Sequence, residues 1–174
     1  MRLLRVRHYF LLFSIAFIFS CSDHSKSLTD NAELPFSLPA NWEVFETIHT
    51  SRSKVAHNIV TSTGDIASVV RVFEADVGVV LNSKEMLNQY VTNALPEGAI
   101  RNSAKIYSGT VERANEPGVV AHIVTPEPFP SDFVIEVYTF RVRNEQFIVM
   151  FNIAINNISN LEDEMRDVIK SIKV

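Results

Sequence analysis

The sequence predicts an α+β domain. Its core is an antiparallel β-sheet of about six or seven strands, packed with a mid-chain helix and a C-terminal helix. The first observation is a series of short runs, rich in β-branched and aromatic residues and separated by turn-forming residues, along most of the 174-residue chain. The second is a pair of segments that carry apolar residues at helical spacing behind a capping residue.

The first twenty residues have the organisation of a bacterial signal peptide. Arg2, Arg5 and Arg7 form a basic start without acidic residues, and residues 9–19 are dominated by large apolar side chains. A run of this length is too short to cross the roughly 30 Å of a bilayer's hydrocarbon core as a helix. We therefore expect residues 1–20 to be removed rather than retained as a membrane span.

Residues 18–21, Ile-Phe-Ser-Cys, resemble the lipobox of bacterial lipoproteins, with an aliphatic residue at −3 and a small residue before the cysteine. The resemblance implies cleavage before Cys21 and lipid, such as palmitate, on that residue, which is the single cysteine of the chain. Ser22, in place of an aspartate, resembles an outer-membrane address in proteobacterial lipoproteins. The alternatives are an ordinary signal peptide with an incidental cysteine and a retained N-terminal anchor.

Three segments follow from this interpretation: a signal peptide over 1–20, a lipidated flexible tether over 21–33 and one α+β domain over 34–174. The tether is polar apart from Leu28. Cleavage removes three arginines and no acid, which leaves 13 basic and 20 acidic residues and a net charge of −7. That balance argues against a nucleic-acid partner and against a polybasic membrane-binding patch.

Strand signals dominate the first part of the domain. Residues 36–38 are a short apolar alternation that ends at a proline, and residues 42–46 follow a Pro-Ala-Asn turn. Residues 55–60 and 66–73 are β-branched runs, and the Thr-Ser-Thr-Gly-Asp sequence between them predicts a turn.

The second part of the domain predicts two further pairs of strands. The first pair covers 105–113 and 119–125, joined by a turn over 115–118, and the second covers 133–143 and 146–155. The last strand has the clearest period of two, which predicts a half-buried strand with Gln146 on its polar side. The residues that share its apolar face are Phe147, Val149, Phe151, Ile153 and Ile155.

Two helices are expected on the apolar faces of the sheet. The first opens at Asn82, has Glu85 at the capping-box spacing and ends at Pro96. The second opens with a full capping box from Ser159 to Glu162. The apolar stripe of the second helix consists of Leu161, Met165, Val168, Ile169 and Ile172.

The order of elements resembles the Mog1/PsbP-like fold, including bacterial DcrB-type lipoproteins. The resemblance lies in Leu-Pro-Ala-Asn-Trp at 38–42, the helix after Asn82 and the ending Asp-Val-Ile-Lys-Ser-Ile at 167–172, and it would cover 34–174. Members of this family bind protein partners or support membrane complexes rather than share a catalytic site. No functional residue carries over from the family to a position in this chain.

Catalytic and metal-binding motifs are absent from the sequence. The mature histidines are His24, His49, His57 and His122, and none belongs to a His-Glu-x-x-His motif. We expect surface or hydrogen-bonded strand histidines, and no metal. No serine lies in Gly-x-Ser-x-Gly, and neither glycine-rich phosphate motif occurs, so the sequence indicates no cofactor and no enzyme.

Glu127, Asp132 and Glu136 are spaced as paired carboxylates would be around a loop. A solvated acidic loop is the favoured interpretation, because no cleft can be established from the sequence.

Two features are candidate partner contacts. Residues 125–132 form a proline-stiffened loop that would present Phe129 at little entropic cost, unless Phe129 folds back onto the core. Arg141 and Arg143 should project from one face of a strand, where they would meet an acidic partner or remain a solvated strand end.

Trp42 is expected in the core.

The function that follows is a non-enzymatic lipoprotein of the cell envelope. It would be anchored through Cys21, facing the periplasm from the outer membrane, and would present its domain to a protein partner. The alternative is a binding module for a small hydrophobic or envelope-derived ligand held between sheet and helix. An apolar pocket would favour the alternative, whereas a filled core with an exposed patch would favour the protein partner.

Overall fold

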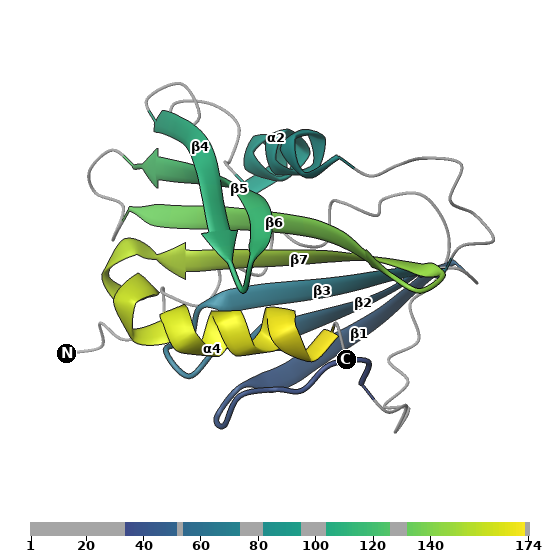
Figure 1. Ribbon diagram of the computed structural model, residues 1–174. Helices are drawn as coiled ribbons and strands as arrows, with labels where there is room; N and C mark the ends of the chain where they lie inside the picture. Colours follow the sequence, from purple (N-terminus) through teal and green to yellow (C-terminus); the bar gives the residue numbers. More distant parts are fainter. Residues whose placement is uncertain (1–33, 52–53, 74–81, 95–103, 126–131, 173–174) are drawn as a thin grey trace.

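The computed structural model describes residues 34–51, 54–73, 82–94, 104–125 and 132–172 (Figure 1). They form one antiparallel sheet with the strand order β1-β2-β3-β7-β6-β5-β4. The strands are β1 (Glu43–Ser51), β2 (Lys54–Val60), β3 (Ile66–Phe73), β4 (Lys105–Arg113), β5 (Glu116–Val124), β6 (Phe133–Val142) and β7 (Glu145–Ala154). The expected fold class and the larger of the expected strand numbers are confirmed.

The helices cover opposite faces of the sheet. Helix α2 (Ser83–Ala94) packs on β5 and β6, and α4 (Ile158–Ile172) follows a short 3₁₀ turn, η3 (Ile155–Asn157), and packs across the other face (Figure 1). The α2 helix begins after Asn82, whose Oδ1 accepts a hydrogen bond from Lys84 N at 2.9 Å, as the predicted cap requires.

The core under α4 is the larger of the two apolar clusters. The predicted stripe of α4 lies entirely inside it, on Phe147, Val149, Phe151 and Ile153 of β7. Trp42 is also buried there, as expected, and its ring lies edge-on to Phe151 with centroids 6.4 Å apart. The Trp42 indole N–H donates to Glu164 Oε2 at 2.7 Å, and this hydrogen bond connects the segment before β1 to α4.

The core under α2 is built from the alternate residues of the same strands. Leu87, Tyr90 and Val91 of α2 pack on Ile135, Ile148 and their neighbours. Strand β7 is therefore buried on both faces, with eight successive residues from Gln146 to Ile153 out of solvent. The expectation of a half-buried last strand was wrong, because it lies in the middle of the sheet with a helix on each side.

The N-terminal segment differs from the prediction. Residues 36–38 are irregular rather than a strand, and Trp42 N donates to Pro39 O at 3.2 Å in the turn that leads into β1. Phe36 is nevertheless buried in the α4 core. The apolar alternation there reflects packing of a loop onto the core rather than pairing in the sheet.

The turn between β4 and β5 is shorter than predicted. Ala114 and Asn115 form it, with φ of 53° and 60°, and this left-handed pair is typical of a two-residue hairpin turn. Pro117 and Gly118, expected in the turn, lie inside β5 opposite Glu112 and Val111. Pro117 is tolerated because the pairing of β5 with β6 begins only at Gly118.

The start of the C-terminal helix also differs. Ser159 lies inside α4 rather than at its cap, because the 3₁₀ turn η3 precedes the helix. Ile155, expected on the apolar face of the last strand, falls in that turn and is exposed. Glu162, the other half of the predicted capping box, instead forms ion pairs with Arg113 and Arg166.

Candidate functional site

The residues predicted to contact a membrane or a partner are only partly covered by the structure. Cys21 and Phe129 lie outside the described residues. Arg141 lies near the end of β6, two residues beyond Thr139, whose hydroxyl donates to Ser83 of α2 at 3.3 Å. Arg141 is thus on the α2 face and exposed, whereas Arg143 stands in the β6–β7 turn with φ of 54°. The two arginines therefore do not project from one face of a strand.

The histidines of the described residues do not converge. His57 of β2 is buried, its Nδ1 lies 3.1 Å from Thr47 Oγ1, and burial, with smaller effects of His49 and Arg71, lowers its pKa. His122 lies across the sheet in β5. Within the described residues, no three histidine, cysteine or carboxylate side chains are placed to share a metal ion. In the same part of the chain, neither helix is long and apolar enough to cross a membrane.

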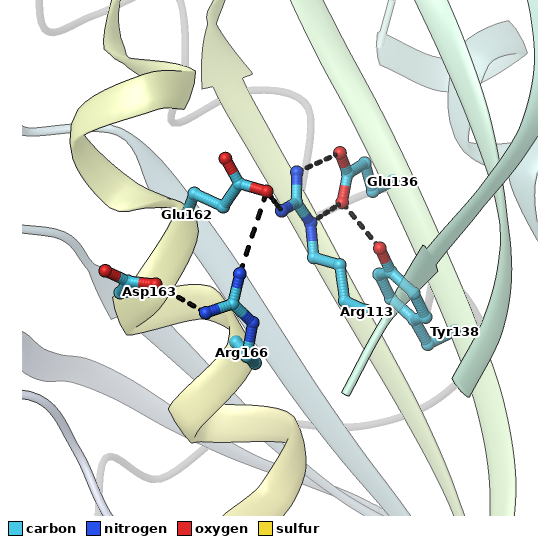
Figure 2. Close-up of polar contacts among 6 residues, drawn as sticks. All are labelled: Arg113, Glu136, Tyr138, Glu162, Asp163 and Arg166. Carbon is cyan, nitrogen blue, oxygen red and sulfur yellow. Dashed lines mark hydrogen bonds and ion pairs between the residues drawn. The ribbon is translucent and has the colours of Figure 1, made fainter. Parts of the chain in front are cut away.

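The prediction that Glu136 belongs to a solvated acidic loop was wrong. This residue belongs to β6, is 3% exposed and forms an ion pair with Arg113, the last residue of β4. Arg113 Nε donates to Glu136 Oε2 at 2.6 Å and its NH2 group donates to Oε1 at 2.8 Å, a bidentate pair (Figure 2). Tyr138 completes the arrangement by donating its hydroxyl to Glu136 Oε2 at 2.7 Å.

The same arginine reaches the C-terminal helix. Its NH1 group lies 3.3 Å from Glu162 Oε1 on α4, and Glu162 in turn faces Arg166, which also pairs with Asp163 (Figure 2). The hydrogen bond to Glu136 is the main cause of a raised Arg113 pKa, and burial is the main cause of a raised Tyr138 pKa. These hydrogen bonds and ion pairs connect the tip of the β4–β5 hairpin to β6 and α4.

Away from this cluster of ion pairs, the outer strand of the hairpin, β4, is exposed to solvent. All residues from Lys105 to Thr110 in β4 are exposed, and β4 is the last strand in the sheet order. Ile106 and Tyr107 are 44% and 58% exposed. By strand alternation Ile106 faces the α2 side and Tyr107 the α4 side, so β4 presents a large apolar side chain on each face of one edge.

Tyr107 contacts a residue of the neighbouring strand, β5. Its ring lies 6.2 Å from the ring of His122, which is directly opposite in β5, at a tilt of 44°. His122 Nε2 is buried and has no hydrogen-bond partner in the described part of the chain, while Asp132 Oδ2 lies 3.8 Å from it. Asp132 Oδ1 accepts from Thr125 N at 3.2 Å. This open surface, which we call the β4 surface, consists of Ile106, Tyr107, His122 and Asp132.

The sequence did not indicate the β4 surface. The strand bounds of 105–113 were predicted correctly, but the place of a strand at the edge or centre of a sheet depends on the tertiary order. Exposed large side chains in a strand of mixed polarity carry no sequence signal of their own.

No family model and no curated protein matches the chain. Among solved structures, it is similar to LpqN of Mycobacterium tuberculosis, a protein involved in cell envelope biogenesis. That match has a TM-score of 0.39 and 8% identity, and it covers 76% of this chain and 78% of LpqN. The chain is also similar to the PsbP protein of the cyanobacterium Synechocystis, with a TM-score of 0.44 and 9% identity, over 87% of this chain and 95% of that one. Both are likenesses of fold.

Proposed function

We propose that this protein is a non-enzymatic lipoprotein of the cell envelope that presents its α+β domain to a protein partner through the β4 surface. The membrane attachment rests on the lipobox-like sequence at Cys21 and on the polar tether that follows it. An outer-membrane location facing the periplasm belongs to the same proposal.

The exposed edge strand is the observation that carries the partner-binding function. Ile106 and Tyr107 are consecutive residues of β4 that point to opposite faces of this edge strand, and they are 44% and 58% exposed. Tyrosine is enriched in protein interfaces because its ring offers a large contact area and its hydroxyl a polar contact. In the described residues, α2 and α4 lie on opposite faces of the sheet, each over a cluster of buried apolar side chains. These buried clusters, together with an exposed apolar edge, favour a protein partner over a small ligand between sheet and helix.

The test is photo-crosslinking in living cells. A photoreactive phenylalanine analogue replaces Tyr107 in the full-length chain, and in a matched control it replaces Phe45. Phe45 is an exposed aromatic residue of β1, at the opposite edge of the sheet. We expect one reproducible crosslinked protein with the probe at 107, lost when Ile106→Asp is added, and absent with the probe at 45.

Equal capture from both positions, or capture that survives Ile106→Asp, would contradict the proposal. The predicted contact of Phe129 belongs to the same experiment. Phe129→Ala should reduce capture by the probe at position 107 if that loop takes part in the interface.

A further inference from the structure

The two edges of the sheet are built differently. The pairing of β1 with β2 shifts register twice, between Val44 and Glu46 and between His49 and Ser51. Such bulges disturb the outer hydrogen-bonding groups of an edge strand and protect it from pairing with another strand. Strand β4 pairs with β5 in unbroken register from Lys105 to Arg113. Its outer edge is therefore regular and able to accept a further strand.

The sequence of β4 is complementary to itself around Ser108. When a second copy is placed antiparallel with Ser108 opposite Ser108, Tyr107 of each copy lies opposite Gly109 of the other. A Cβ on Gly109 would meet only Val120 Cγ1, at 3.6 Å, so this face of the strand has room for a ring. An aromatic residue across from a strand glycine covers the exposed backbone. On the other face, Ile106 lies opposite Thr110, and β-branched residues pair well across strands.

The pairing of Tyr107 with Gly109 distinguishes this register from its neighbour. Centring the pair on Gly109 would place Tyr107 opposite Val111, so the ring would no longer cover a strand glycine. It would also place Lys105 opposite Arg113, whose buried guanidinium is already paired with Glu136. In the register centred on Ser108, Lys105 lies opposite Val111 and Arg113 stays outside the paired stretch. The register centred on Tyr107 places Lys105 opposite Gly109 and shortens the paired segment.

We propose that the partner at β4 is a second copy of this chain, paired antiparallel about Ser108 so that one sheet runs through both copies. The proposal rests on the proposed function, of which it names the partner. The two-fold arrangement is closed, so it yields a dimer rather than a fibre. An edge contact of this size is weak in dilute solution, and confinement of both copies to one membrane raises their effective concentration.

Disulfide trapping in isolated membranes tests the register directly. In an antiparallel pair, directly opposed Cα atoms are about 4.5–5.5 Å apart, within the ~4.4–6.8 Å range of disulfides. Ser108→Cys in the full-length chain, exposed to copper-phenanthroline and dissolved oxygen, should form a disulfide dimer on a non-reducing gel. The unsubstituted chain, with Cys21 as its single cysteine, is the control for dimers made through that residue.

Thr110→Cys is the matched variant. Thr110 is exposed on the same face of the same strand as Ser108. In the proposed register the two Thr110 Cα atoms are about 14 Å apart, from a four-residue offset at roughly 3.4 Å per residue, too far for a disulfide. We expect roughly tenfold more dimer from Ser108→Cys than from Thr110→Cys.

Equal dimer from both variants, or no dimer above the control, would overturn the proposal. The photo-crosslinking result distinguishes failure of the self-pairing from failure of the proposed function. Capture of a different protein by the probe at position 107, without a Ser108→Cys dimer, leaves the proposed function standing and removes the self-pairing. Absence of both products contradicts both.

Discussion

At the scale of single residues, the buried pair of Arg113 and Glu136 is the most consequential feature. Both side chains are less than a tenth exposed, and all of their short contacts run between the β4–β5 hairpin, β6 and α4 (Figure 2). A buried ion pair adds little net stability over an apolar pair, but removal of one partner leaves an uncompensated charge. The pair therefore specifies the position of the hairpin that carries the β4 surface.

Removing the charge of Arg113 should destabilise the fold strongly. Arg113→Met is expected to lower the free energy of unfolding by about 3–5 kcal/mol, because Glu136 stays buried without its partner. Adding Glu136→Gln should restore much of the loss, since the amide oxygen still accepts from Tyr138. Urea unfolding measures both. Arg166→Met, at a solvent-exposed pair on α4, is the control, with a cost of about 1 kcal/mol or less. Similar costs for Arg113→Met and Arg166→Met would contradict this role.

His57 should make the stability fall in mild acid. Burial holds its folded pKa below 6.5, so on acidification the unfolded chain takes up a proton before the folded one does. The contribution is intact above about pH 6.5 and is lost as the pH falls toward the folded pKa. Urea midpoints at pH 7.5 and 5 should differ less for His57→Gln than for the parent. An equal acid loss in both proteins would show that His57 is not the group responsible.

At the scale of elements, the β4–β5 hairpin depends on one glycine. A Cβ at Gly118 would lie 2.5 Å from Tyr138 Cε1 and 3.0 Å from the carbonyl oxygen of Val137. The Tyr138 ring thus lies over the backbone of β5, between the hairpin and Phe151, whose ring is 6.1 Å away. The glycine that appeared to mark a turn is required by this close approach.

Gly118→Ala should therefore destabilise the domain by about 1–3 kcal/mol through overpacking. Gly109→Ala is the control in the neighbouring strand, because its Cβ would make an ordinary contact with Val120 at 3.6 Å. We expect that change to be neutral or to stabilise by up to about 1 kcal/mol. Thermal and urea unfolding compare the two. Equal effects would exclude the steric role of Gly118.

The element types and most boundaries could be predicted from local pattern, whereas the candidate site could not. Strands β3 and β4 have the predicted bounds, and the β-branched run of β3 follows a clear turn sequence. The pairing of Arg113 with Glu136 joins residues 23 positions apart, and no local spacing reveals it. The Ala114–Asn115 turn was missed because alanine rarely adopts positive φ, while Pro117 and Gly118 suggested a turn in the wrong place.

At the scale of the whole molecule, the proposed lipid anchor at Cys21 and the exposed edge strand β4 belong to one chain. With residues 22–33 as the proposed tether, coil scaling would give a root-mean-square reach of roughly 20 Å, which would keep a domain attached at Cys21 close to the membrane. An edge strand on such a domain would meet other membrane-bound proteins, including further copies of itself, at high local concentration. Lipid attachment is therefore the claim on which both the location and the partner depend.

The most direct test of that claim is metabolic fatty-acid labelling with membrane fractionation of the parent chain and of Cys21→Ser. We expect the parent to be labelled and to sediment with membranes. We expect the variant to carry no label and to be no longer processed before position 21. Persistent labelling and unchanged membrane retention of Cys21→Ser would contradict lipid attachment at this residue.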